Sequence, residues 1–199
     1  LADFAEAVAQ ARPALAAITA GARDGRAPLS FAQQRLWFLS QMDGASRAYH
    51  MPLGLTLSGA LDEVALGRAL DGLVARHEIL RTRFVAEDGE PVQVIDAPAG
   101  FALSREDLSG RDGGEARLAA LAEAEAEAPF DLARGPLIRG RLVKLDAGRW
   151  ALLITMHHII SDGWSMGVLA RELGALYAAF SQGRQDPLEP LAVQYADYA

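Results

Sequence analysis

Two adjacent histidines near the end of a long apolar run are the residues best suited to chemistry. His157 and His158 lie in the segment Met156–Trp164, and they are two of the four histidines in the chain. The apolar run Trp150–Ile160 predicts a strand buried on both faces, in which neighbouring side chains point in opposite directions. We therefore expect one imidazole to face a cavity and the other to be held in packing.

A carboxylate follows the histidine pair. Asp162 lies four residues after His158, where it could orient an imidazole or hold the loop by pairing with an arginine. A metal site is a weaker interpretation, because the two histidines point apart and the nearest other candidates, His50 and His77, are distant in sequence. Ordinary core histidines are the alternative, but a histidine pair at a strand end followed by Asp-Gly favours a functional site.

A second charged segment, Arg76–Phe84, lies where a predicted helix meets a predicted strand. Taken alone, it is typical of a helix C-terminus with favourable cations. The sharper alternative is a buried ion pair between one of its arginines and Asp162. The sequence has no nucleophile elbow and no phosphate-binding loop. Ser161 and Ser165 border the histidines, and turn or capping duties are their commoner use.

The elements that position these residues alternate between helices and strands. Ser30 and Gln33 have the spacing of a capping box and predict a helix to about Met42. Asp88-Gly89 predicts a hairpin turn between strands over 82–86 and 92–95. Apolar spacing predicts further strands over 49–58, 137–145 and 150–160, and helices over 62–76, 114–128 and 169–180. This alternation predicts an α/β fold with a mixed sheet.

Composition limits the class of protein. The chain has 199 residues, of which 51% are hydrophobic, carries a net charge of −7 and lacks cysteine. These values fit one domain or one lobe, exclude disulfides and cysteine nucleophiles, and argue against a nucleic-acid ligand. No apolar run reaches the roughly 18 residues of a membrane span. No signal peptide and no initiating Met are present, so we expect a piece of a longer cytoplasmic polypeptide. Glu123, Glu125 and Glu127 are expected on a solvated face.

Four segments together resemble the motifs of the condensation domains of nonribosomal peptide synthetases. They occur in the family's order at 30–39, 76–84, 156–165 and 195–199, and the third matches the family's His-His-x-x-x-Asp-Gly signature. The first motif and Tyr49–Pro52 are most similar to the class that takes an L-configured donor. Residues 1–11 resemble the last helix of a peptidyl carrier domain, which leaves 12–28 as a linker.

The resemblance implies a chloramphenicol-acetyltransferase-like fold, with a mixed sheet flanked by helices. Such domains have two lobes with the active site in a tunnel between them, and residues 29–199 would form the N-terminal lobe. The implied activity is acyl transfer: the α-amine of an acceptor aminoacyl thioester attacks a donor aminoacyl or peptidyl thioester, and an amide bond forms. The isolated lobe is expected to be inactive.

The resemblance also implies residue roles. His158 is the expected tunnel-facing catalytic residue, acting as a base or as a positioning group. His157 is expected to be structural, as the opposite-face argument requires. Asp162 is expected to be structural and paired with Arg81 of the second motif. Gly163 would let the substrate approach the backbone closely.

The implied partners are an upstream donor carrier domain, a downstream acceptor carrier domain and the C-terminal lobe. No cofactor or metal is expected on this chain, because the substrates arrive on the 4′-phosphopantetheine arms of the carriers. Neither nucleic acid nor a membrane is an expected partner. Three alternatives remain open: an epimerisation domain, an acyl-coenzyme A-dependent acyltransferase of the same fold, and a carrier-docking lobe without catalysis.

Overall fold

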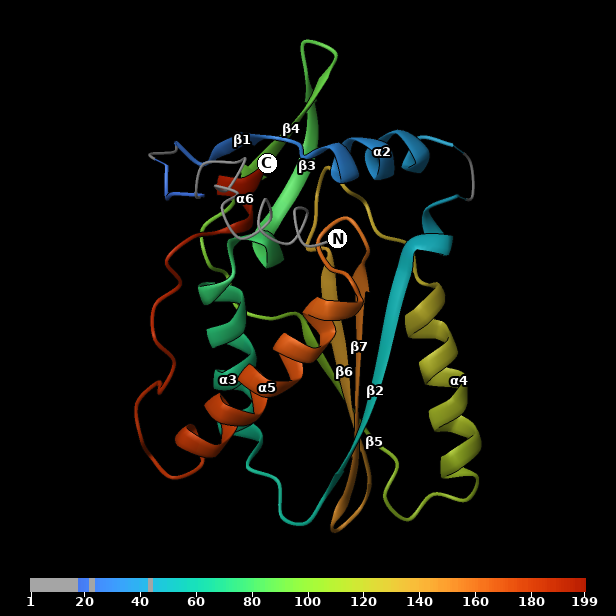
Figure 1. Cartoon of the computed structure of the whole chain (residues 1–199). Helices are drawn as coiled ribbons and strands as arrows, with labels where there is room; N and C mark the ends of the chain where they lie inside the picture. Colours follow the sequence, from blue (N-terminus) through green and yellow to red (C-terminus); the bar gives the residue numbers. More distant parts are fainter. Residues whose placement is uncertain (1–17, 22–23, 43–44) are drawn as a thin grey trace, which may run out of the picture.

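Two β-sheets form the framework of the chain, and helices cover the larger sheet on both faces (Figure 1). The computed structural model describes residues 18–21, 24–42 and 45–199. The strands are β1 (Arg26–Pro28), β2 (His50–Ser58), β3 (Thr82–Glu87), β4 (Glu90–Ile95), β5 (Leu103–Asp107), β6 (Ile138–Asp146) and β7 (Arg149–His157). The helices are α2 (Phe31–Ser40), α3 (Glu63–Arg76), α4 (Gly114–Glu127), α5 (Gly163–Phe180) and α6 (Tyr195–Tyr198), with 3-10 turns η1 (Ala45–Tyr49) and η2 (Glu78–Arg81).

The larger sheet has the strand order β2-β7-β6-β5. Neighbouring strands are antiparallel except β5, which pairs parallel with β6. Every residue of β7 after Arg149 is buried, as the long apolar run predicts. The edge strand β2 shows the expected alternation of half-buried and exposed side chains, from Met51 to Leu57. The predicted mixed sheet is therefore confirmed.

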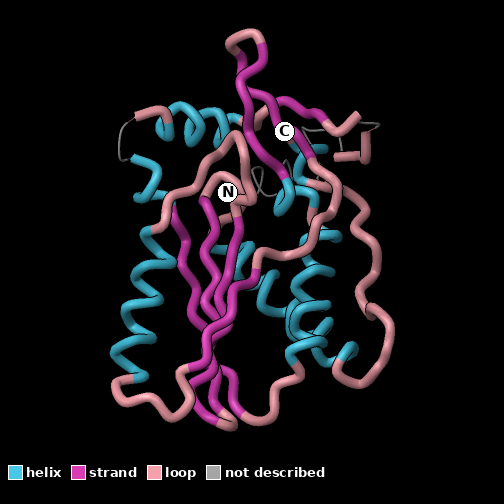
Figure 2. Tube along the Cα trace, turned by 180° about the vertical axis from the view of Figure 1, so that it is seen from behind, coloured by secondary structure: helices cyan, strands magenta, loops and turns pink. Residues whose placement is uncertain are grey.

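Strand parity decides which helices each side chain of β7 meets. Leu152, Ile154 and Met156 join a core cluster that includes the buried leucines of α3 and α5. Ala151 and Leu153 join a second cluster, which includes residues of α4. The view from behind shows the helices on either side of this sheet (Figure 2). Odd-numbered residues of β7 thus face the side of the sheet that α4 covers.

The smaller sheet has the strand order β1-β4-β3, and α2 follows β1 almost directly. At the β3–β4 turn, Asp88 has φ 52° and Gly89 has φ 88°. A tight hairpin turn needs this left-handed backbone, which the Asp-Gly pair adopts readily. At the start of α2, the Ser30 side chain accepts the backbone N–H of Gln33, and the Gln33 side chain accepts that of Ser30. The predicted hairpin and capping box are both confirmed.

Several predicted boundaries differ from the structure. The strand predicted to reach Ile160 ends at His157, and α5 begins at Gly163 instead of Leu169. Ile159 and Ile160 are buried within the turn that follows β7, so their apolar side chains extend the hydrophobic pattern beyond the strand. The sequence pattern also gave no indication of β5.

The structure describes part of the predicted linker but not the predicted carrier-domain helix. The last residues of the predicted linker, Arg26–Pro28, form β1 and pair with β4. The predicted carrier-domain helix over 1–11 lies outside the described residues, as does part of the linker. Within the described residues, no helix is both long and apolar enough to cross a membrane.

The expectation of a solvated glutamate face on α4 is wrong for one residue. Glu125 is buried and bonds to two arginines of β6. Its carboxylate oxygens lie 3.3 Å from Arg139 Nε and 2.8 Å from Arg141 Nη2. A buried carboxylate needs such partners, and they come from a strand that is distant in sequence.

Candidate active site

The turn that joins β7 to α5 carries the histidine pair. The backbone N–H of Ile160 donates to the carbonyl of His157 at 3.1 Å, and that of His158 donates to the carbonyl of Tyr49 at 2.8 Å. The strand ends here because the chain reverses direction, and α5 begins five residues after His158. The turn is thus closed by its own backbone bond and held at His158 to the residue that precedes β2.

His157 is fully buried. Its odd number in β7 directs the ring to the α4 side of the sheet, where the rings of Phe130 and His50 lie 6.2 Å and 6.1 Å away between centroids. The backbone N–H of Ile159 donates to His157 Nδ1 at 3.1 Å, so the proton of the neutral ring is on Nε2. Burial, with smaller contributions from the nearby His50 and His158, lowers the pKa of His157 to about 4. The ring is therefore neutral at physiological pH.

The structure brings one distant histidine to the site and keeps the other away. His50 is the register partner of His157 across β2 and β7, and its Nδ1 donates to the carbonyl of Ala126 at 2.7 Å. His77 instead lies with its Nε2 2.6 Å from a carboxylate oxygen of Glu172 on α5. In the sequence, the only feature that could have pointed to His50 was its place at the start of the predicted strand over 49–58. In the structure this strand pairs with β7.

His158 is exposed, in contrast to its neighbour. Its Nδ1 lies 2.5 Å from the carbonyl oxygen of Ser161. A carbonyl oxygen can only accept, so the neutral ring carries its proton on Nδ1 and has its lone pair on Nε2. This nitrogen can accept a proton or a hydrogen bond from a substrate. His157 is held in packing, as expected for one ring of the pair, whereas His158 is exposed and lies in the turn beyond the end of β7.

Asp162 is the N-cap of α5. One of its carboxylate oxygens accepts the backbone N–H of Ser165 at 2.8 Å and the Ser165 hydroxyl at 2.6 Å. These two bonds lower the pKa of the Asp162 carboxyl. The helix N-terminus offers unpaired N–H groups, so a carboxylate at this position is well placed without any arginine.

The predicted ion pair between Asp162 and Arg81 is wrong. The Arg81 guanidinium donates to the carbonyl of Asp96 and lies 3.7 Å from a carboxylate oxygen of Glu78. The 3-10 turn η2 directs Arg81 to the strand connection after β4, whereas Asp162 is used in capping α5. The two residues thus serve separate local structures.

Gly163 and Trp164 leave space next to the motif. A Cβ added at Gly163 would meet nothing within 4 Å, so the backbone is open to close approach there. The Trp164 side chain is 80% exposed. On the other side of the turn, Ser161 and Ser165 help to line a largely apolar cavity of about 370 Å³. Among the described residues, no three His, Asp or Glu side chains gather as a metal site would require.

Comparisons with known sequences identify one family. The family model described as "Condensation domain" matches residues 23–199. Malpinin synthetase of Mortierella alpina is 47% identical over 194 residues. That match covers 98% of this chain but 2% of the synthetase, so the chain spans a small part of its relative.

Solved structures agree with the sequence comparisons. The X-domain from teicoplanin biosynthesis has a TM-score of 0.81 and 38% identity, over 92% of this chain and 39% of that one. The first condensation domain of the calcium-dependent antibiotic synthetase, in complex with a substrate analogue, has a TM-score of 0.76 and 27% identity, over 84% of this chain and 42% of that one. The predicted chloramphenicol-acetyltransferase-like lobe, with a mixed sheet flanked by helices, is thereby confirmed.

Proposed function

Because the chain belongs to the condensation-domain family of nonribosomal peptide synthetases, we propose that it supplies His158 to amide bond formation between two carrier-bound thioesters. The α-amine of the acceptor aminoacyl thioester attacks the carbonyl carbon of the donor thioester. The new C–N bond replaces the donor's C–S bond. The thiol of the donor's arm leaves, and the amine gives up one proton.

The observation that supports this role is the tautomer of His158. Its Nδ1 proton is directed to the carbonyl of Ser161, so the lone pair of the exposed ring is on Nε2. A lone pair at this atom suits both open forms of the mechanism. It can take a proton from the attacking amine, or it can accept a hydrogen bond that orients the amine. His157 offers no such atom, because its ring is buried.

The chemistry makes modest demands on the base. A thioester is already activated, and a free α-amine has a pKa of about 8, so a useful fraction is neutral at working pH. Holding two reactants in the correct geometry can supply about 7–11 kcal/mol of the acceleration. We therefore assign to this site mainly the task of holding the amine against the thioester carbon.

The other motif residues support the turn. His157 fills the buried side of the turn, and Asp162 fixes the start of α5. Gly163 leaves the backbone open to the substrate arm. Arg81, with no link to Asp162, is assigned to holding the connection after β4 through the carbonyl of Asp96.

The proposed partners are an upstream donor carrier and a downstream acceptor carrier, which present L-configured donor and acceptor substrates on phosphopantetheine arms in the cytoplasm. A second lobe completes the tunnel. The described residues include exposed large apolar side chains, such as Phe31 and Phe38 of α2 and Trp164, as expected for a lobe that packs against a partner. The 199-residue chain alone is therefore expected to be inactive.

The test uses the full-length protein with its donor and acceptor carriers loaded. The mass of the acceptor carrier is followed for the wild type and for His158→Ala. We expect the wild-type acceptor to gain the mass of the donor acyl group, and the variant acceptor to remain unchanged. Product formation at equal rates would remove His158 from the mechanism.

Three other outcomes would change the reaction class. If neither protein forms product although both carriers are loaded, the lobe docks carriers without catalysis. If the donor residue is recovered with inverted configuration and no new amide, the chain is part of an epimerisation domain. Transfer from free acyl-coenzyme A would indicate an acyl-coenzyme A-dependent acyltransferase of the same fold.

A further inference from the structure

A buried glutamine of α2 reaches the turn that carries His158. Gln33 is 1% exposed, whereas its neighbours Ala32 and Gln34 are exposed. A buried amide must be hydrogen-bonded at both ends. The Gln33 Oε1 atom accepts the backbone N–H of Ser30 at 3.0 Å, which completes the capping box. The capping role uses only this oxygen and leaves the amide nitrogen for other partners.

The Gln33 amide nitrogen has two acceptors. Its Nε2 donates to Gln93 Oε1 at 3.2 Å and to the carbonyl of Ile159 at 3.5 Å. Gln93 is fully buried, and its own Nε2 donates to the carbonyl of Pro28 at 2.7 Å. The backbone groups at both ends fix the orientation of the two amides, because a carbonyl can only accept and an N–H can only donate. The pair thus joins α2, β4 and the turn after β7.

This chain of bonds ends one residue from His158. The N–H of Ile159 donates to His157 Nδ1, and its carbonyl accepts from Gln33. Ile159 is thereby held at both of its backbone polar atoms. The Ile159 N–H belongs to the peptide shared with His158, and the Ile159 carbonyl belongs to the next peptide, so the two bonds hold the backbone directly after His158. The Gln33 contact thus acts on the backbone that directly follows His158.

We propose that Gln33 is a positioning residue for His158, acting through the carbonyl of Ile159. This inference rests on the proposed function of His158 for its effect on catalysis, but the geometry of the turn does not depend on that function. Gln33 touches no reacting atom. Its loss shifts the turn, and a displacement of about 1 Å at a reacting group can cost about 100-fold in rate.

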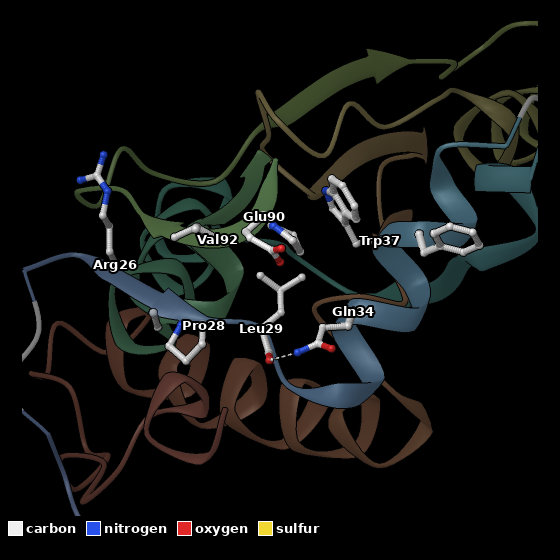
Figure 3. Close-up of a pocket in the computed structure, with 10 residues that line it drawn as sticks. Arg26, Pro28, Leu29, Gln34, Trp37, Glu90 and Val92 are labelled. Carbon is white, nitrogen blue, oxygen red and sulfur yellow. Dashed lines mark hydrogen bonds between the residues drawn. The ribbon is translucent and has the colours of Figure 1, made fainter. Parts of the chain in front are cut away.

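The chain offers two matched controls. Ser30→Ala removes the side-chain cap of α2 and the bond between the Ser30 and Tyr195 hydroxyls, while Gln33 keeps its bonds to Ser30 N, Gln93 and Ile159. Tyr195→Phe, which removes only the hydroxyl bond, separates that contact from the cap. Gln34 lies next to Gln33 on the same helix but faces outwards, and its side chain donates to the carbonyl of Leu29 at 3.1 Å (Figure 3). Gln34→Met therefore repeats the chemical change of Gln33→Met without touching the turn.

The experiment measures two quantities in the full-length protein. The first is kcat and KM for amide formation with the loaded acceptor carrier. The second is the rate at which diethylpyrocarbonate modifies His158, followed by peptide mass spectrometry. For Gln33→Met we expect kcat to fall by about 10- to 100-fold with KM changed less than about 2-fold. We expect the modification rate of His158 to change by more than the roughly 2-fold allowed for the controls, because the ring moves relative to solvent and to the Ser161 carbonyl.

The controls decide between positioning and capping. Ser30→Ala and Gln34→Met should keep both quantities within about 2-fold of the wild type. If Ser30→Ala loses as much activity as Gln33→Met, or if His158 modification is unchanged in Gln33→Met, the proposal is wrong. Should Gln33→Met fail to fold, Gln33→Glu keeps the acceptor for Ser30 N and removes the amide donor. It is expected to change both quantities in the same direction, and wild-type values would equally reject the proposal.

The modification rate also separates this inference from the proposed function. If the wild type forms no amide, the proposed function fails. A changed modification rate in Gln33→Met would then still support control of His158 by Gln33, and an unchanged rate would reject it.

Discussion

The two histidines at the end of β7 differ sharply, although they are consecutive in sequence. His157 is buried on the α4 side of the sheet, and its Nδ1 accepts a backbone N–H. His158 is exposed, and its Nδ1 donates to a backbone carbonyl. The backbone partners therefore select opposite tautomers for the neutral forms of the two rings. The comparison shows that the backbone partner of each ring, and not the residue type, decides which nitrogen is left for chemistry.

The surroundings of the two rings differ in the same way. His157 meets His50 and Phe130, whose rings are within 6.2 Å between centroids, so any charge on it would be poorly solvated. His158 lies beside the polar start of α5, where Asp162 and Ser165 bond to each other. One side of the turn is thus packed against neighbouring rings, and the other is polar and open to solvent.

The largest expected effect comes from replacing each histidine with alanine, because one variant should lose activity and the other stability. His158→Ala should lower the rate of amide formation by at least about 100-fold, whether it removes a positioning group or a base. It should leave the free energy of unfolding within about 0.5 kcal/mol of the wild type. His157→Ala should cost about 3–4 kcal/mol of stability, because it empties a fully buried site. Acceptor-carrier mass spectrometry and urea unfolding of the complete condensation domain measure the two effects.

The reverse pattern would break the comparison. A stable, inactive His157→Ala variant beside a destabilised, active His158→Ala variant would transfer the catalytic role to the buried ring. The His158→Gln variant serves as a control, because it keeps a polar side chain at the exposed position and still lacks the imidazole base.

A smaller effect should appear as a dependence of stability on pH. The pKa of His157 is about 4 in the folded protein, against 6.5 for an unperturbed histidine. Between these values the unfolded chain binds the additional proton, so stability falls as the pH decreases from about 6.5 to about 4 and levels off below. The shift corresponds to a loss of about 3 kcal/mol over that window. Urea midpoints measured across the window give this value.

The His157→Leu variant isolates this contribution from the carboxylates that titrate in the same range. Between about pH 6.5 and pH 4, its free energy of unfolding should fall by about 3 kcal/mol less than that of the wild type. Parallel curves for the two proteins would mean that His157 is protonated in the fold, and its assignment as the neutral, packed ring would be wrong.

The sequence predicted those parts of the fold that depend on local chemistry. The Asp88-Gly89 hairpin, the Ser30–Gln33 capping box and the alternation along β2 each depend on residues a few positions apart. The packed position of His157 was also predictable, because this residue still belongs to β7, whereas the exposure of His158 depends on the turn that follows the strand. The fold class followed from the order of these elements, and family resemblance identified the lobe.

The features that were predicted wrongly, or not at all, depend on contacts between segments that are separated in sequence. Burial of Glu125 follows from two arginines of β6, which no pattern within α4 reveals. The end of β7 at His157 was hidden, because Ile159 and Ile160 remain buried after the strand has ended. Gln33 was predicted as a cap from its spacing, but its amide nitrogen finds Ile159 only in the folded chain.

The smallest expected effect concerns Asp162, which differs from the histidines because its role is local to α5. Asp162→Ala should cost about 1 kcal/mol through loss of the cap, and Asp162→Asn should stay within about 0.5 kcal/mol of the wild type. Because Asp162 bonds to Ser165 and Arg81 bonds to the carbonyl of Asp96, Asp162→Ala and Arg81→Ala should be additive within about 0.5 kcal/mol. A coupling above about 1 kcal/mol would restore the ion pair expected from the sequence. In that case Asp162 would connect the second and third motifs, and the polar side of the turn would be fixed by tertiary contacts as firmly as the buried side.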